Sequence, residues 1–149
     1  MRPTGVVLIA IYHFLTALFL AILAIALGVG GTVLGAMFAA GQNSPLGGLG
    51  MAVGVVGAIA FLIGAAIAAV AGYGIWALRE WGRILSIVLA AISLLFSVPG
   101  LLLGHHHVFF LIGSLHLIRI AIAVLIIWYL VQPQISALFQ RAARIAPSA

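Results

Sequence analysis

Apolar positions along the chain fall into four long blocks that short polar stretches separate. The first block, residues 6–29, carries no formal charge. Three more blocks follow at 51–78, 82–103 and 108–131. About 20 apolar residues in a helix cross a hydrocarbon core of about 30 Å, so each block is long enough to span a bilayer. The pattern therefore predicts four membrane-spanning helices.

The connections between the blocks are short or uncharged. Residues 30–50 are rich in Gly and contain the clearest loop signal of the chain at 42–45. Within this connection, 32–40 is predicted to form a short helix on the membrane surface. Residues 104–107, Gly-His-His-His, predict a tight outer turn. Pro99 lies just before that turn and predicts a kink or the end of the third helix.

The C-terminal segment 133–149 begins at Pro133, which ends the fourth block. Apolar residues recur in it at helical spacing and the polar residues lie elsewhere, which is typical of an amphipathic helix at the lipid headgroups. A frayed, solvated terminus is the alternative interpretation. The sequence thus predicts an all-α polytopic membrane protein with one domain, 1–149. Its expected architecture is a four-transmembrane-helix bundle with a short C-terminal amphipathic helix.

Small residues four apart recur in the second block, at Gly50, Gly54 and Ala58 and again at Gly64, Ala68 and Gly72. Such rows let helix backbones approach closely, which matters in lipid because the hydrophobic effect no longer drives helices together. Packing within the chain is one interpretation. A seam between copies in a homo-oligomer is the other.

The composition excludes an ordinary soluble domain. Of 149 residues, 66% are hydrophobic and 5% are charged, against about 25% charged in soluble domains. The net charge of +5 arises because the chain has six arginines and a single carboxylate residue, Glu80. The arginines are scattered, so no nucleic-acid surface is predicted. Without cysteine, disulfides and thiolate chemistry are excluded.

Charge placement predicts the orientation. Residues 72–86 form a turn between two apolar blocks, with Arg79, Glu80 and Arg83 at its centre and tryptophans beside them. If there are four spans, five arginines share one side of the membrane: Arg2, Arg79, Arg83, Arg141 and Arg144. The positive-inside rule then places both termini in the cytoplasm. A secretory signal is the rival interpretation of the N-terminus, but the first block exceeds the usual 7–15 apolar residues, which favours an uncleaved anchor.

Several short motifs together resemble a known family: Arg2 to Val6 with Phe14 and Leu15, 72–76 with 80–83, and 128–130 with Pro133 and 138–139. In these positions the chain is similar to a family of small four-helix bacterial and archaeal integral membrane proteins of unknown function. The resemblance implies a four-span protein of the prokaryotic cytoplasmic (inner) membrane and no particular activity. That family tends to have an asparagine near the position of Arg119, so the arginine departs from its pattern.

Five polar residues inside the apolar blocks form the candidate intramembrane polar site: His13, Thr16, Ser93, His116 and Arg119. Arg119 lies thirteen residues before Gln132, which is about 20 Å along a helix. A charge at that depth costs about 2.5–3.5 kcal/mol, so Arg119 should face other helices or water. Glu80 is expected to be too distant to neutralise it. A structural strut, a functional polar site and a contact with a partner subunit all remain open.

The histidines suggest only weak cofactor hypotheses. His13 and His116 differ by about 9 Å in expected depth, which disfavours a haem held between them. A single-histidine haem or chlorin ligand at either position remains an alternative. His105, His106 and His107 are adjacent on a turn and splay apart, so at most a weak surface metal site is expected. We therefore predict no resident cofactor or metal.

Catalytic groups are scarce, since paired carboxylates, Cys and Lys are all missing. We therefore expect that the chain is not an enzyme. The first functional hypothesis is a structural or accessory membrane protein in a homo-oligomer or a larger membrane complex. The alternative is a small permeation or lipid/anion-handling protein with its polar site around Arg119. The bilayer is the one partner that both hypotheses require.

Overall fold

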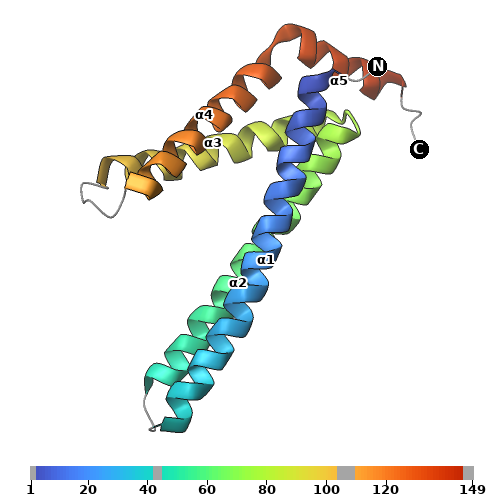
Figure 1. Cartoon of the computed structure of the whole chain (residues 1–149). Helices are drawn as coiled ribbons and strands as arrows, with labels where there is room; N and C mark the ends of the chain where they lie inside the picture. Colours follow the sequence, from blue (N-terminus) through green and yellow to red (C-terminus); the bar gives the residue numbers. More distant parts are fainter. Residues whose placement is uncertain (1–2, 42–44, 104–109, 146–149) are drawn as a thin grey trace. The chain divides into compact units, whose positions relative to one another are not determined.

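The residues that the structure describes form five helices and no strand. The structure is a computed structural model that describes residues 3–41, 45–103 and 110–145, with the side chains of 38–49, 98–116 and 143–145 left out. The helices are α1 (Thr4–Gly41), α2 (Pro45–Trp76), α3 (Glu80–Leu103), α4 (Phe110–Val131) and α5 (Pro133–Ile145), as Figure 1 shows. The prediction of an all-α chain is confirmed.

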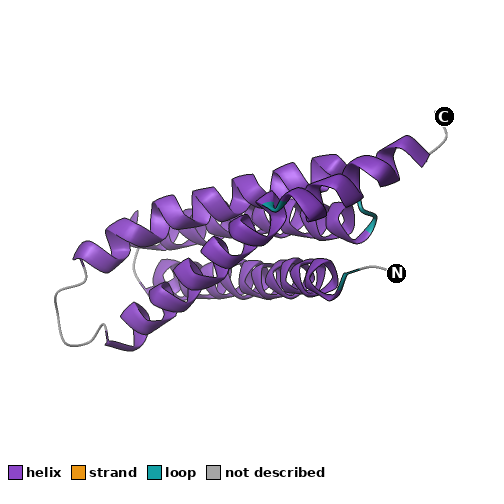
Figure 2. Cartoon of the chain, turned by 90° about the horizontal axis from the view of Figure 1, so that it is seen from above, coloured by secondary structure: helices purple, strands orange, loops and turns teal. Residues whose placement is uncertain are grey.

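The chain divides into two compact units. The hairpin unit, Ile11–Val70, holds most of α1 and α2, which lie side by side in Figures 1 and 2. The second unit, here called the α3–α5 unit, consists of Met1–Ala10 and Ala71–Ala149. It contains the first turns of α1, the end of α2 and all of α3, α4 and α5.

Glycines hold the two helices of the hairpin unit together. Gly31 on α1 and Gly54 on α2 approach so closely that a Cβ on Gly54 would lie 2.6 Å from the Gly31 Cα. The same register continues in both directions, with Gly35 beside Gly50 and Ala58 beside Gly28. The first small-residue row of the sequence therefore packs within the chain. The residues of α1 that face this row, Gly28, Gly31 and Gly35, are also small, so the close contact extends over several turns.

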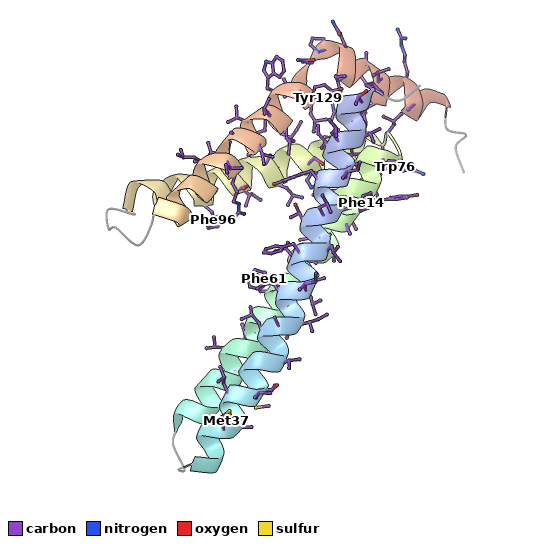
Figure 3. The ribbon with its side chains drawn as sticks, in the orientation of Figure 1. Phe14, Met37, Phe61, Trp76, Phe96 and Tyr129 are labelled. Atoms are coloured by element: carbon purple, nitrogen blue, oxygen red, sulfur yellow. The ribbon has the colours of Figure 1, made fainter. Side chains whose placement is uncertain are left out.

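The α3–α5 unit is built around α3 and α4, which run in opposite directions and pack against each other (Figure 1). Helix α5 begins at Pro133, is bent by 64° from α4, and contacts both α3 and α4. Proline ends α4 because it lacks the amide hydrogen that the next helical bond requires. The first turn of α1 also belongs here, where the Tyr129 ring of α4 lies against the backbone of Gly5 (Figure 3).

Large apolar side chains remain exposed along the helices, for example Phe14, Met37 and Phe96 in Figure 3. Three described helical segments are long and apolar enough to cross a membrane: Thr4–Met37, Gly50–Trp76 and Glu80–Ser97. A fourth, Leu117–Val131, meets that criterion only together with Pro133–Ala142. The structure is thus that of a membrane protein with three or four candidate spans.

Three local expectations differ from the structure or lie outside it. Residues 32–40 do not form a separate surface helix, because α1 continues without interruption to Gly41. Glycine costs about 1 kcal/mol in a helix, and here the Gly31–Gly54 contact offsets part of that cost. Of the two expectations for Pro99, an end of the helix is not observed, because α3 continues to Leu103, where the predicted block 82–103 also ends. The predicted outer turn with its three histidines lies outside the described residues.

Candidate functional site

The turn between α2 and α3 carries the charged residues Arg79, Glu80 and Arg83. At the end of α2 the Arg79 amide donates to the Gly74 carbonyl (2.8 Å) and the Leu78 amide to the Ile75 carbonyl (3.1 Å). These two bonds form a Schellman motif, which satisfies carbonyls that the helix end leaves free. The motif needs a left-handed residue at its second-last position, directly before Arg79, and Leu78 supplies it with φ of 52°. Glycine is usual there, so the leucine carries a conformational cost.

Arg79 ends one helix and begins the next. Its carbonyl accepts the first amide bonds of α3, from Gly82 (3.0 Å) and Arg83 (3.3 Å). Glu80 occupies the first turn of α3, where a negative charge interacts favourably with the helix dipole. Its Oε1 also accepts from Arg83 Nη2 at 3.4 Å. The turn residues Arg79, Glu80 and Arg83 thus shape and charge the start of α3.

Two glycines let the helices meet directly beside this turn. A Cβ on Gly74 would lie 2.6 Å from the Cα of Gly82 and 2.7 Å from the ring of Trp81. A Cβ on Gly82 would in turn overlap the Gly74 backbone. Neither position has room for any side chain, because backbone atoms are the obstacle and cannot rotate away. The backbone contact explains why both glycines stand in the turn stretch.

Two polar groups near the turn are buried without a partner among the described residues. Arg83 is only 15% exposed at its side chain, and its Nε finds no acceptor. Ser86 is fully buried one turn further along α3, and its Oγ is likewise unpaired. Ser97 is also buried on α3. The sequence analysis did not identify Ser86 and Ser97. The available signal was their spacing on one helix face, because Ser86 lies four residues from both Gly82 and Ala90, and Ser97 lies seven residues after Ala90.

In the hairpin unit, the histidine and threonine of the candidate polar site do not act on each other. Thr16 donates its hydroxyl to the Tyr12 carbonyl of its own helix at 2.8 Å. His13 is buried, and its ring lies edge-on to that of Tyr12 with the centroids 5.6 Å apart. Its Nε2 has no partner in the described part of the chain. Thr16 is therefore satisfied locally and His13 is not.

Arg119 lies exposed on α4. It makes no hydrogen bond or ion pair with the described residues, and Ser93 on α3, which is half-buried, does not reach it. The side chain of His116 lies outside the described ones. Among the described side chains of α4, Ala123, Ile126 and Leu130 are buried. Because positions four, seven and eleven apart share a helix face, Arg119 lies on the same face as this stripe but is itself exposed.

The five intramembrane candidates are divided between the two units. His13 and Thr16 belong to the hairpin unit, while Ser93, His116 and Arg119 belong to the α3–α5 unit. Within the described residues, no three His, Asp or Glu side chains form a group that could hold a metal ion. The turn residues are brought together by the fold. The intramembrane candidates are not joined by any described contact.

Comparisons with protein-family models, with curated proteins and with solved structures gave no match to this chain.

Proposed function

We propose that this chain is a non-catalytic integral membrane protein with a structural or accessory role in a homo-oligomer or a larger membrane complex. The observation that carries the proposal is the exposure of large apolar side chains along all the candidate spans. In the most apolar windows of Thr4–Met37 and Gly50–Trp76, 22% and 17% of the residues are buried. The remaining surface is available to lipid and to other helices.

Features of the α3–α5 unit support a topology of four crossings with both termini in the cytoplasm. Helix α4 has 22 residues, about 33 Å, which matches the hydrocarbon core. The contact of Gly5 with Tyr129 joins the start of α1 to the end of α4, and α5 contacts α3. This arrangement supports placing the N-terminus, the turn between α2 and α3 (the arginine turn) and α5 on the same side of the membrane.

Helix α5 is proposed to lie at the cytoplasmic headgroups. Ile135 and Phe139 are buried against the protein, while Gln140 and Arg141 are exposed. The 64° bend after α4 turns the helix away from the direction of the span. An exposed arginine beside apolar residues favours an interface that contains anionic lipid. The prokaryotic inner membrane, implied by the family resemblance, is the proposed location.

A non-catalytic role is favoured by the way the polar residues are used. Glu80, the one carboxylate residue, interacts with Arg83 and the start of α3. Thr16 bonds to its own helix. Proton transfer or nucleophilic attack needs a base and its partner within hydrogen-bond reach, and no described pair meets that requirement.

The proposal is tested by measuring the size of the native assembly. The full chain, expressed at its natural level, is cross-linked in intact membranes and then separated by native electrophoresis in mild detergent. We expect a discrete species larger than the monomer, either a multiple of the chain or a complex with other subunits. Migration only as a monomer, before and after cross-linking, would contradict a role in an assembly.

One observation favours the alternative of a permeation or lipid/anion-handling protein. Arg119 is exposed within an apolar helix, as an arginine that binds an anion would have to be. Flux of chloride or phosphate through reconstituted vesicles, compared between the wild type and Arg119→Leu, tests it. Selective loss of flux in the variant would support this alternative over the structural role.

A further inference from the structure

Arg119 shares one face of α4 with side chains that are buried within the protein. The buried stripe of α4 contains Ala123, Ile126 and Leu130, and Arg119 continues it. The opposite face carries large exposed apolar side chains: Leu117, Val124, Leu125, Trp128 and Val131. Lipid suits that opposite face. Arg119 lies on the face that packs against protein, although its own side chain is exposed.

Arg119 is too deep to be neutralised by headgroups. It lies nine residues from the start of α4 at Phe110 and twelve from its end at Val131, about 14 Å and 18 Å. An extended arginine side chain reaches about 6–7 Å, so its guanidinium still ends well inside a core of about 30 Å. A group that pairs with it must come from another helix at the same depth.

The chain has no counter-charge to offer. Glu80 is its one carboxylate side chain, and it lies at the first residue of α3, within 3.4 Å of Arg83. A second copy brings the same residues and no more. A two-fold interface centred on this stripe would also place two Arg119 side chains near each other, and like charges repel strongly in a low dielectric. Self-association through this face is therefore disfavoured.

We infer that the Arg119 end of the α4 stripe binds a transmembrane helix of a different membrane protein that carries an Asp or Glu near mid-bilayer. A carboxylate there would accept hydrogen bonds from the guanidinium, which is how intramembrane charges are usually satisfied. The inference rests on the proposed accessory role and narrows it. It selects a larger complex over a homo-oligomer and gives the chemistry of the partner.

The test uses the full chain in phosphatidylcholine vesicles with synthetic helices as probes. Three Leu/Ala helices of about 24 residues carry Asp, Asn or Leu at the centre, and association is followed by energy transfer. Hydrogen bonds between model helices in membranes are worth about 1–2 kcal/mol, so the Asp helix should bind about tenfold more tightly than the Leu helix. The Asn helix separates hydrogen bonding from charge and is expected to fall between them.

Variants test whether the tighter binding of the Asp helix over the Leu helix depends on Arg119. Arg119→Leu should abolish this preference and Arg119→Lys should keep most of it. Arg141→Leu, the same change at another exposed arginine, should leave it unchanged. Equal binding of the Asp and Leu helices by the wild type, or a preference that survives Arg119→Leu, would overturn the inference. Helix content and size of each variant are checked by circular dichroism and gel filtration, and the lysine variant retains the test if the leucine variant fails to fold.

A lipid control tests another source of the counter-charge. If phosphatidylglycerol in the vesicles removes the preference for the Asp helix, lipid phosphate satisfies Arg119 and the inference is wrong.

A second experiment is done in cells. There Arg119→Leu should shift the cross-linked native assembly toward smaller species, while Arg141→Leu should not. An assembly that Arg119→Leu leaves intact overturns the inference but not the proposed function. The absence of any assembly in the wild type would instead contradict the proposed function.

Discussion

Gly74 on α2 and Gly82 on α3 touch through their backbones, within eight residues of chain and across a tight turn. A Cβ on Gly82 would lie 2.5 Å from the Gly74 Cα and 2.7 Å from the amide nitrogen of Ile75. The contact lets α3 start directly beside the end of α2. It couples the Schellman motif at Leu78 to the charged start of α3 at Glu80.

Gly82→Ala is expected to destabilise the protein by about 1–3 kcal/mol, because an added methyl group must push two backbones apart. The measurement is the thermal unfolding midpoint of the purified protein in detergent. The matched control is Gly30→Ala, where no atom lies within 4 Å of the added Cβ. Replacing a helical glycine there should raise the midpoint slightly. Equal midpoints for the two variants would contradict the close contact.

A second close glycine contact joins α1 and α2 in the hairpin unit. Gly54→Ala places a methyl group 2.6 Å from the Gly31 Cα and 3.0 Å from the Leu27 carbonyl oxygen, so α1 and α2 must separate. Gly57→Ala, three residues further along α2, meets only the Leu27 side chain at 3.6 Å. We expect faster proteolysis and a lower unfolding midpoint for the Gly54 variant alone. Similar behaviour of both variants would argue against the observed register.

Leu78 adopts a left-handed conformation that costs an L-residue about 1–2 kcal/mol. Leu78→Gly removes that cost and should raise stability by about 1 kcal/mol after the greater flexibility of unfolded glycine is subtracted. Leu78→Ala keeps the strain and shortens the side chain, so it should bring no gain. The two variants are compared by unfolding midpoint in the same detergent. Loss of stability in both the alanine and the glycine variant would show that side-chain packing dominates at this position.

Glu80→Gln is expected to lower stability by at most about 1 kcal/mol. The carboxylate is 41% exposed, so solvent screens its interaction with Arg83, and its effect on the helix dipole is of similar size. The difference in stability between the variant and the wild type should shrink as the salt concentration rises from 50 mM to 1 M, because the Debye length falls to about 3 Å at 1 M. A difference independent of salt would assign the effect to packing.

Much of the fold followed from the position of apolar residues and prolines. The block boundaries at the arginine turn and at Pro133 agree with the ends of α2 and α4, because a charged turn and a missing amide act locally. The extension of α1 to Gly41 could not be read from residues 30–41, since glycine disfavours helix in isolation. It depends on a partner row on α2, which is tertiary information.

The candidate sites were less predictable than the helices. The turn residues were found because charges are rare in this sequence. The left-handed turn position was not, because leucine is an unusual residue there and gives no signal. Arg119 stood out by its charge, but its exposure and its place on the α4 stripe required the burial pattern of Ala123, Ile126 and Leu130.

The most direct test of the four-crossing topology uses the absence of native cysteine. Single cysteines are introduced by Ala77→Cys in the arginine turn, Ser136→Cys in α5 and Asn43→Cys between α1 and α2. A membrane-impermeant maleimide is then applied to intact cells. We predict that only the residue 43 variant is labelled and that the other two react after permeabilisation. Labelling of positions 77 and 136 from opposite sides of the membrane would contradict the account.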